Sequence, residues 1–233
     1  MNRVVSAARL QGAHPMVSLG VPWMVVSISF AINLAIWGLA DLDSQPDASA
    51  TTGGLASLYI TVVVVYAQTV TQMFPFALGL SLSRRTYYLG TALAALVQSL
   101  LFAVALTALT VVENATDGWG VGLDFWAPGS VDVGNPALQV LVFTFPMLAA
   151  CFIGIGIGVV FKRWGATGMY ALGIGTFAVT GLAIIVLTWR EAWGDTWTWL
   201  TERSVESMTI GLPAVLAIAL AGLTYLGLRR AVP

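Results

Sequence analysis

The stretch MFPFALGLSLSRRTYYLGTAL, residues 73–93, joins two long apolar runs through a short polar turn that carries two adjacent arginines. The chain on both sides of it avoids charge: of 233 residues, 58% are hydrophobic and 9% are charged, and the mean hydropathy is +0.86. Soluble domains usually have about 25% charged residues. The composition therefore predicts an all-α membrane protein, in which this turn links two membrane-spanning helices.

Six segments have the roughly 20 apolar residues that a helix needs to cross a bilayer. Their apolar runs are continuous rather than alternating, which favours helices over the strands of a barrel. We expect a single transmembrane domain, residues 1–233, with spans at about 17–39, 55–79, 91–112, 136–161, 167–189 and 209–228.

The charged residues separate between the two sides of this predicted topology. One side receives eight of the ten basic residues, namely Arg3, Arg9, Arg84, Arg85, Lys162, Arg163, Arg229 and Arg230. The other side receives Arg190, Arg203 and every acidic residue: Asp41, Asp43, Asp47, Glu113, Asp117, Asp124, Asp132, Glu191, Asp195, Glu202 and Glu206. Because cytoplasmic loops are enriched in Lys and Arg, both termini are predicted to be cytoplasmic.

The distribution of charge also bears on mechanism. No charged residue or histidine lies deep within a predicted span, which disfavours a proton- or ion-coupled carrier. The only lysine, Lys162, is followed by Arg163 and is not part of a Gly-rich phosphate-binding loop. The spans show no paired carboxylates and no nucleophile–base set, so we expect this chain not to be an enzyme.

Six spans, cytoplasmic termini, the 73–93 stretch and the absence of an ATPase motif together resemble the permease subunit of a bacterial ABC transporter of the exporter class, which includes drug, antibiotic and polysaccharide exporters. The resemblance implies a homodimer, or a heterodimer with a second permease. It also implies a separate ABC ATPase subunit, with ATP and Mg bound there and no cofactor on this chain. The lipid bilayer is the other expected partner, and no nucleic acid is expected.

In such permeases the cytoplasmic turn between the second and third spans couples to the ATPase. The resemblance assigns this role to residues 80–90, which we call the elbow, with the contact residues Ser83, Arg84, Arg85, Tyr87 and Tyr88. Arginine binds carboxylates in a bidentate manner and tyrosine offers rigid contact area, so these residue types suit a docking surface. Alternatively, Arg84 and Arg85 only set the orientation of the chain and contact anionic lipid headgroups.

Two amphipathic segments match other parts of the same resemblance. Residues 2–12 are expected to form a short helix along the inner membrane surface, and outer half-helices are expected before the last span, with a bend at Gly194. There Trp189, Trp193 and Trp197 recur at helical spacing, either as an outer gate or as an interfacial anchor. Trp119 and Trp126 in the preceding outer loop would extend the same aromatic belt.

Polar side chains within the spans are candidates for a transport pathway. Gln68 and Gln72 are four residues apart and share one helix face, and the resemblance adds Asn33 to the lining. The alternative for such amides is hydrogen bonding between helices, which we favour for Gln98.

The expected function is export of an amphipathic or hydrophobic substrate by alternating access. Nine arginines against one lysine suggest a GC-rich bacterial genome, so we expect the chain in a bacterial plasma membrane. The rival is an ion- or solute-coupled carrier, or a substrate-capture subunit of another transport complex.

Overall fold

The structure is a computed structural model of the chain and describes residues 3–11, 15–40 and 52–229. Apart from one isolated bridge residue, the regular secondary structure of these residues is helical, as predicted. The helices are α1 (Arg3–Gln11), η1 (Met16–Gly20), α2 (Val21–Ala40), α3 (Ala56–Gly79), α4 (Arg84–Ala115), η3 (Gly118–Gly122), η4 (Gly129–Val131), α5 (Pro136–Trp189), α6 (Trp193–Glu202), η5 (Ser207–Gly211) and α7 (Leu212–Arg229). His14, the acidic residues at 41, 43 and 47, and Arg230 lie outside the described residues.

Five helical segments of the described chain are long and apolar enough to cross a membrane: Met16–Ala40, Ala56–Gly79, Arg84–Ala115, Pro136–Trp189 and Ser207–Arg229. They confirm that this is a multi-pass helical membrane protein by length and composition. The third is longer than the predicted 91–112, since it begins at the arginine pair of the elbow.

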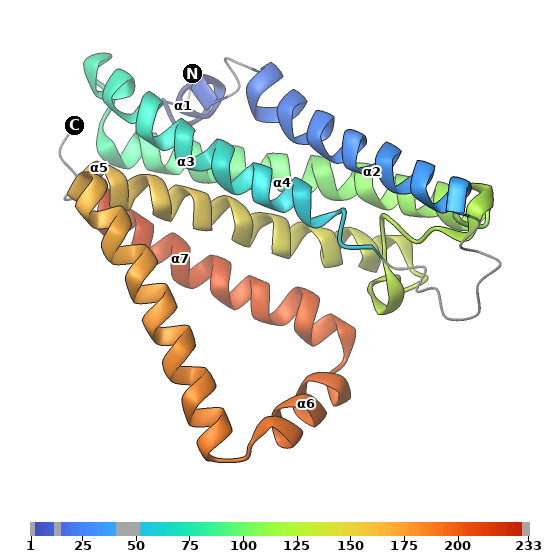
Figure 1. Cartoon of the computed structure of the whole chain (residues 1–233). Helices are drawn as coiled ribbons and strands as arrows, with labels where there is room; N and C mark the ends of the chain where they lie inside the picture. The colour runs from blue at the N-terminus through green and yellow to red at the C-terminus, as the bar shows by residue number, and fades with distance from the viewer. Residues whose placement is uncertain (1–2, 12–14, 41–51, 230–233) are drawn as a thin grey trace.

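The fourth and fifth predicted spans form one element, α5, which bends at Gly165. That residue has φ 60° and ψ −148°, a conformation outside the helical region that glycine adopts readily. We therefore describe α5 as a first arm, 136–164, and a second arm, 166–189. In Figure 1 the first arm lies within the bundle, and the second arm leaves it towards α6.

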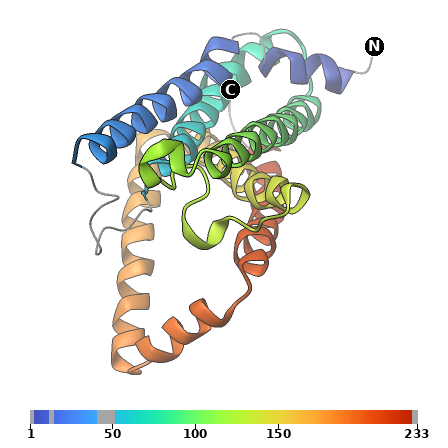
Figure 2. The ribbon, with the colours of Figure 1, turned by 90° about the vertical axis from the view of Figure 1, so that its right-hand side faces the viewer.

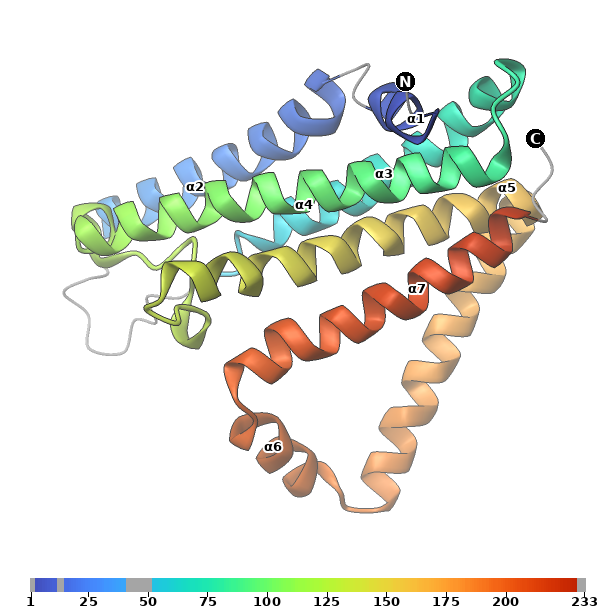
Figure 3. The same ribbon diagram turned by 180° about the vertical axis from the view of Figure 1, so that it is seen from behind.

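The bundle consists of α2, α3, α4, the first arm of α5, and α7, which run side by side (Figures 1 and 3). The second arm of α5 and α6 stand apart from it, and α7 returns to pack against the first arm (Figure 2). At one end of the bundle lie α1, the connection between α3 and α4, the bend of α5 and the end of α7 (Figure 3). The described basic residues outside α6 and its flanks therefore gather at this end.

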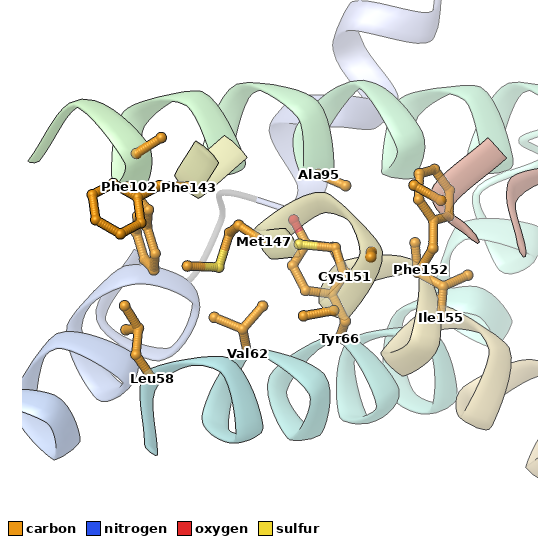
Figure 4. Packing of buried hydrophobic residues seen from close by; sticks show 14 of the residues in the cluster. Leu58, Val62, Tyr66, Ala95, Phe102, Phe143, Met147, Cys151, Phe152 and Ile155 are labelled. Carbon is orange, nitrogen blue, oxygen red and sulfur yellow. The ribbon is translucent and has the colours of Figure 1, made fainter. Parts of the chain in front are cut away.

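The core forms where α3, α4 and the first arm of α5 meet (Figure 4). Leu58, Val62 and Tyr66 of α3 face Phe143, Met147 and Cys151 of α5, and Ala95 and Phe102 come from α4. Two glycines bring the helices together: a Cβ added to Gly158 would lie 2.7 Å from Cβ of Val70, and Gly154 fits against the α3 backbone at Val63. Small residues allow this approach in membrane helices.

Candidate docking site at the turn between α3 and α4

The elbow contains a short turn, residues 80–83, whose backbone groups are hydrogen bonded to the end of α3 and the start of α4. Helix α3 ends in a Schellman motif, in which the N–H of Ser81 donates to the Leu78 carbonyl at 2.9 Å and that of Leu82 to the Ala77 carbonyl at 3.1 Å. Ser81 takes the left-handed conformation that this motif requires, with φ 60°. Ser83 then caps α4, because its hydroxyl oxygen accepts from the Thr86 N–H at 3.1 Å. Four residues thus reverse the chain with a defined geometry.

The two arginines of the elbow have different environments. Arg84 is half-buried, and its Nη1 donates to the carbonyl of Arg229 at 2.8 Å, at the end of α7. A cation at this position also interacts favourably with the helix C-terminus. Arg85 and Ser83 are exposed. Arg85 is therefore the cation of the pair that is available to a partner, while Arg84 fixes the elbow to α7.

Tyr87 and Tyr88 are both buried, with 1% and 6% of their surfaces exposed, which differs from the contact area expected of them. Tyr87 packs its ring against Phe74 at 5.4 Å between centroids. The Tyr88 hydroxyl lies 3.2 Å from Oγ1 of Thr224 in α7, and the Tyr88 ring lies 5.2 Å from that of Tyr225. Both rings are packed against neighbouring helices and are not available to a partner. The exposed residues that remain for docking are Ser83, Arg85 and the neighbouring turn.

Helix α1 supports the elbow from another side. A Cβ added to Gly90 would lie 2.6 Å from Cβ of Ala7, so α1 packs directly on the first turns of α4. Gln11 extends this contact, because its Nε2 donates to Oγ1 of Thr91 at 2.7 Å. The expected helix within residues 2–12 is confirmed over 3–11, and its position on the membrane surface stays a prediction.

The structure does not bring the three predicted pathway residues together. Gln68 and Gln72 are exposed and line a hollow of about 70 Å³ with Gln11 and Ser18. Asn33 instead binds the segment that precedes α3, because its Oδ1 accepts from the Thr52 hydroxyl at 3.0 Å. The preferred interpretation of Gln98 is confirmed, since it accepts from the Tyr66 hydroxyl at 3.0 Å and donates to the Ser18 carbonyl at 2.9 Å.

In the outer tryptophan segment, Trp189 is the last residue of α5, while Trp193 and Trp197 lie in α6, which the short π-helix η5 follows. Trp189, Trp193 and Trp197 are 80%, 49% and 68% exposed, which leaves them available to an interface. The expected bend at Gly194 was wrong, because this residue lies inside α6. The chain turns instead at Glu191, whose φ is 53°.

A buried carboxylate organises the outer loop between α4 and α5, and the sequence analysis did not single it out. Glu113 is 2% exposed and accepts hydrogen bonds from Nε1 of Trp119 and from the N–H groups of Phe125 and Trp126, each at 3.0 Å. Trp126 is consequently buried, and its ring lies 5.3 Å from that of Phe30 in α2. The expectation that Trp126 belongs to an exposed interfacial belt was wrong, because this loop folds into the bundle.

Comparison with known proteins gives no relative of this chain: no family model, no curated protein and no solved structure matches it. Within the described residues, no group of three His, Cys, Asp or Glu side chains is placed to hold a metal ion.

Proposed function

We propose that this chain is the membrane-spanning permease subunit of an ATP-driven ABC exporter, with a separate ATPase subunit docked at the elbow. The observation that carries the proposal is the construction of the elbow itself: a capped four-residue turn with Arg85 exposed. A turn that is hydrogen bonded in this way moves with its two helices rather than bending between them. The ATPase would supply the ATP and Mg, and this chain would supply the path.

The proposal includes six membrane crossings with both termini in the cytoplasm of a bacterium. Each arm of α5, 136–164 and 166–189, exceeds the roughly 20 residues that a crossing requires, so a bend at Gly165 allows two crossings from one element. The basic residues Lys162 and Arg163 immediately precede that bend. This places them at the same end as the elbow, in agreement with the positive-inside rule.

The second arm of α5 supports the proposed assembly of two permeases. Its large apolar side chains are exposed almost all round the helix, for example Ile174, Phe177 and Ile185 at 69%, 82% and 64%. In a bilayer such a helix contacts lipid or a second permease, of the same or another kind. We further propose that Gln68 and Gln72, which are exposed on α3, face the path of an amphipathic or hydrophobic substrate.

Co-purification tests the proposal. The tagged chain is isolated in mild detergent from its native membrane beside the variants Arg85→Glu and Lys162→Glu, and soluble partners are identified by mass spectrometry. We expect a chain with a phosphate-binding loop to accompany the parent and Lys162→Glu, and to be lost from Arg85→Glu. Lys162→Glu is the matched control, since it reverses a basic residue at the same end but outside the elbow. A parent that co-purifies with no ATPase and transports alone would contradict the proposal and favour a carrier.

A further inference from the structure

A large apolar cavity occupies the angle between the two arms of α5 and helix α7. Its volume is about 710 Å³, within the range of about 300–1,000 Å³ that is usual for sites of small organic ligands. Its walls are mostly aliphatic and come from Ile157 and Val160 of the first arm, Leu172 of the second, and Leu220 and Leu223 of α7. A cavity lined in this way favours a hydrocarbon chain over a polar ligand.

One end of this cavity is cationic. Arg163, the residue two before the bend at Gly165, lines the cavity, is half-buried, and lies with its guanidinium carbon 4.3 Å from the centroid of the Trp164 ring. Lys162 precedes it in the chain. The acidic residues of the described chain lie at 113–132, from the last turn of α4 to the loop before α5, and at 191–206, in α6 and its flanks, away from this bend. Within the described residues, Arg163 is therefore a cation with no Asp or Glu side chain at that end of the bundle.

We propose that this cavity binds an anionic phospholipid, with an acyl chain between the arms of α5 and α7 and the phosphate paired with Arg163. Basic pockets between membrane helices at the cytoplasmic side bind anionic headgroups in this way. The lining of the site matches the ligand, because apolar walls end at the cation of Arg163, and the neighbouring Trp164 ring lies against its guanidinium.

Charge favours a lipid over a second copy of the chain as the occupant. Two copies in one membrane have the same orientation, so the acidic residues of a neighbour would lie at the opposite end from Arg163. A second copy could cover the apolar walls but would offer no anion to the guanidinium. The proposal does not depend on ATP-driven export, since it concerns only the binding of lipid by this chain.

Lipid titration followed by native mass spectrometry tests the site. The delipidated chain is titrated with dioleoylphosphatidylglycerol and, separately, with dioleoylphosphatidylcholine, which has the same acyl chains and no net charge. We expect the parent to bind the anionic lipid about fivefold more tightly, the effect of one basic residue near a charged headgroup. Arg163→Gln should remove this preference, Arg163→Lys should retain most of it, and Arg190→Gln, at the far end of the second arm, should leave it unchanged.

A second variant separates the cavity from the surface around it. Thr176→Trp places a large ring in the cavity from the second arm and should weaken binding of both lipids, while size-exclusion chromatography checks that the variant is folded. Equal preference for the anionic lipid in the parent and in Arg163→Gln would overturn the proposal. Loss of a dimer in Thr176→Trp, with no lipid bound by the parent, would overturn it in favour of a second copy.

Discussion

The Tyr88 hydroxyl donates a hydrogen bond to the main-chain carbonyl of Ala221 at 2.5 Å, and so joins the start of α4 to the middle of α7 across 133 positions of sequence. Arg84 adds a second link to α7 at the Arg229 carbonyl. Because α7 follows α6 and η5, the elbow is connected through one helix to the outer tryptophan segment. A displacement of the elbow would therefore displace α7 together with α3 and α4.

The hydrogen bond of the Tyr88 hydroxyl should stabilise the fold beyond the packing of the Tyr88 ring. Tyr88→Phe keeps the packing against Tyr225 and removes the hydroxyl, so we expect a loss of about 1 kcal/mol and a lower melting temperature in mild detergent. Tyr170→Phe is the matched control, because Tyr170 is 72% exposed. Equal melting temperatures for the parent and Tyr88→Phe would show that the hydroxyl contributes nothing to the joint.

The contact between α3 and the first arm of α5 depends on a missing side chain at Gly158. In Gly158→Val the added carbons would meet Val70 and the Ala67 carbonyl, and such overpacking costs about 1–3 kcal/mol. Gly175→Val should have a much smaller effect, since nothing lies within 4 Å of a Cβ at Gly175. Thermal unfolding of the two variants in one detergent measures the difference, and similar losses in both would contradict the close approach.

Glu113 should be required for the fold of the outer loop. Glu113→Ala leaves three N–H donors without their acceptor, and a hydrogen bond to a charged group is worth about 1.5–3 kcal/mol. We expect faster proteolysis within residues 116–135 and a lower melting temperature, with a smaller effect for Glu113→Gln, which keeps one acceptor oxygen. Glu202→Ala, at an exposed position of α6, is the control. A loop that stays protected in Glu113→Ala would show that its aromatic packing suffices.

The hydrophobic runs predicted the helices well, because a membrane-spanning helix can be recognised from its own consecutive residues, by their number and their apolar character. The contacts between distant residues were not predictable in the same way. Nothing in the sequence around Arg84 points to Arg229, 145 residues away, and nothing around Trp126 says that its loop folds inward onto Phe30. The left-handed Glu191 rather than Gly194 provides the turn before α6, because glycine tolerates a helix where the tertiary fold requires one.

The turn that carries the candidate site lies where the sequence predicted it, between α3 and α4, but the environments of its residues were only partly predictable. The turn was predicted from polar and basic residues between two apolar runs, while the docking role of Ser83, Arg84 and Arg85 came from the family resemblance and stays a prediction. The burial of Tyr87 and Tyr88 was not predicted, because it depends on α1 and α7 packing over α4. A tyrosine is amphipathic, so its type alone suits a contact surface and a helix interface equally.

The proposed topology can be tested with single cysteines, because the one native thiol, Cys151, is buried. Leu80→Cys in the elbow and Ala166→Cys after the bend should react with a membrane-impermeant maleimide only when the cytoplasmic face is opened. Thr198→Cys in α6 should react in intact cells. Labelling of Leu80→Cys and Ala166→Cys from opposite faces would contradict six crossings.

Crosslinking from the elbow in native membranes tests the central claim most directly. Leu80 is 54% exposed and ends α3 as its C-cap through main-chain hydrogen bonds, so Leu80→Cys places a thiol in the elbow without removing a proposed contact side chain. With a short heterobifunctional crosslinker, we predict a covalent adduct with a soluble chain that carries a phosphate-binding loop. The yield of this adduct should fall when Arg85→Glu is combined with Leu80→Cys. A Leu80→Cys thiol that reacts with maleimide but yields no protein adduct, in membranes where the chain transports, would contradict docking of an ATPase at this turn.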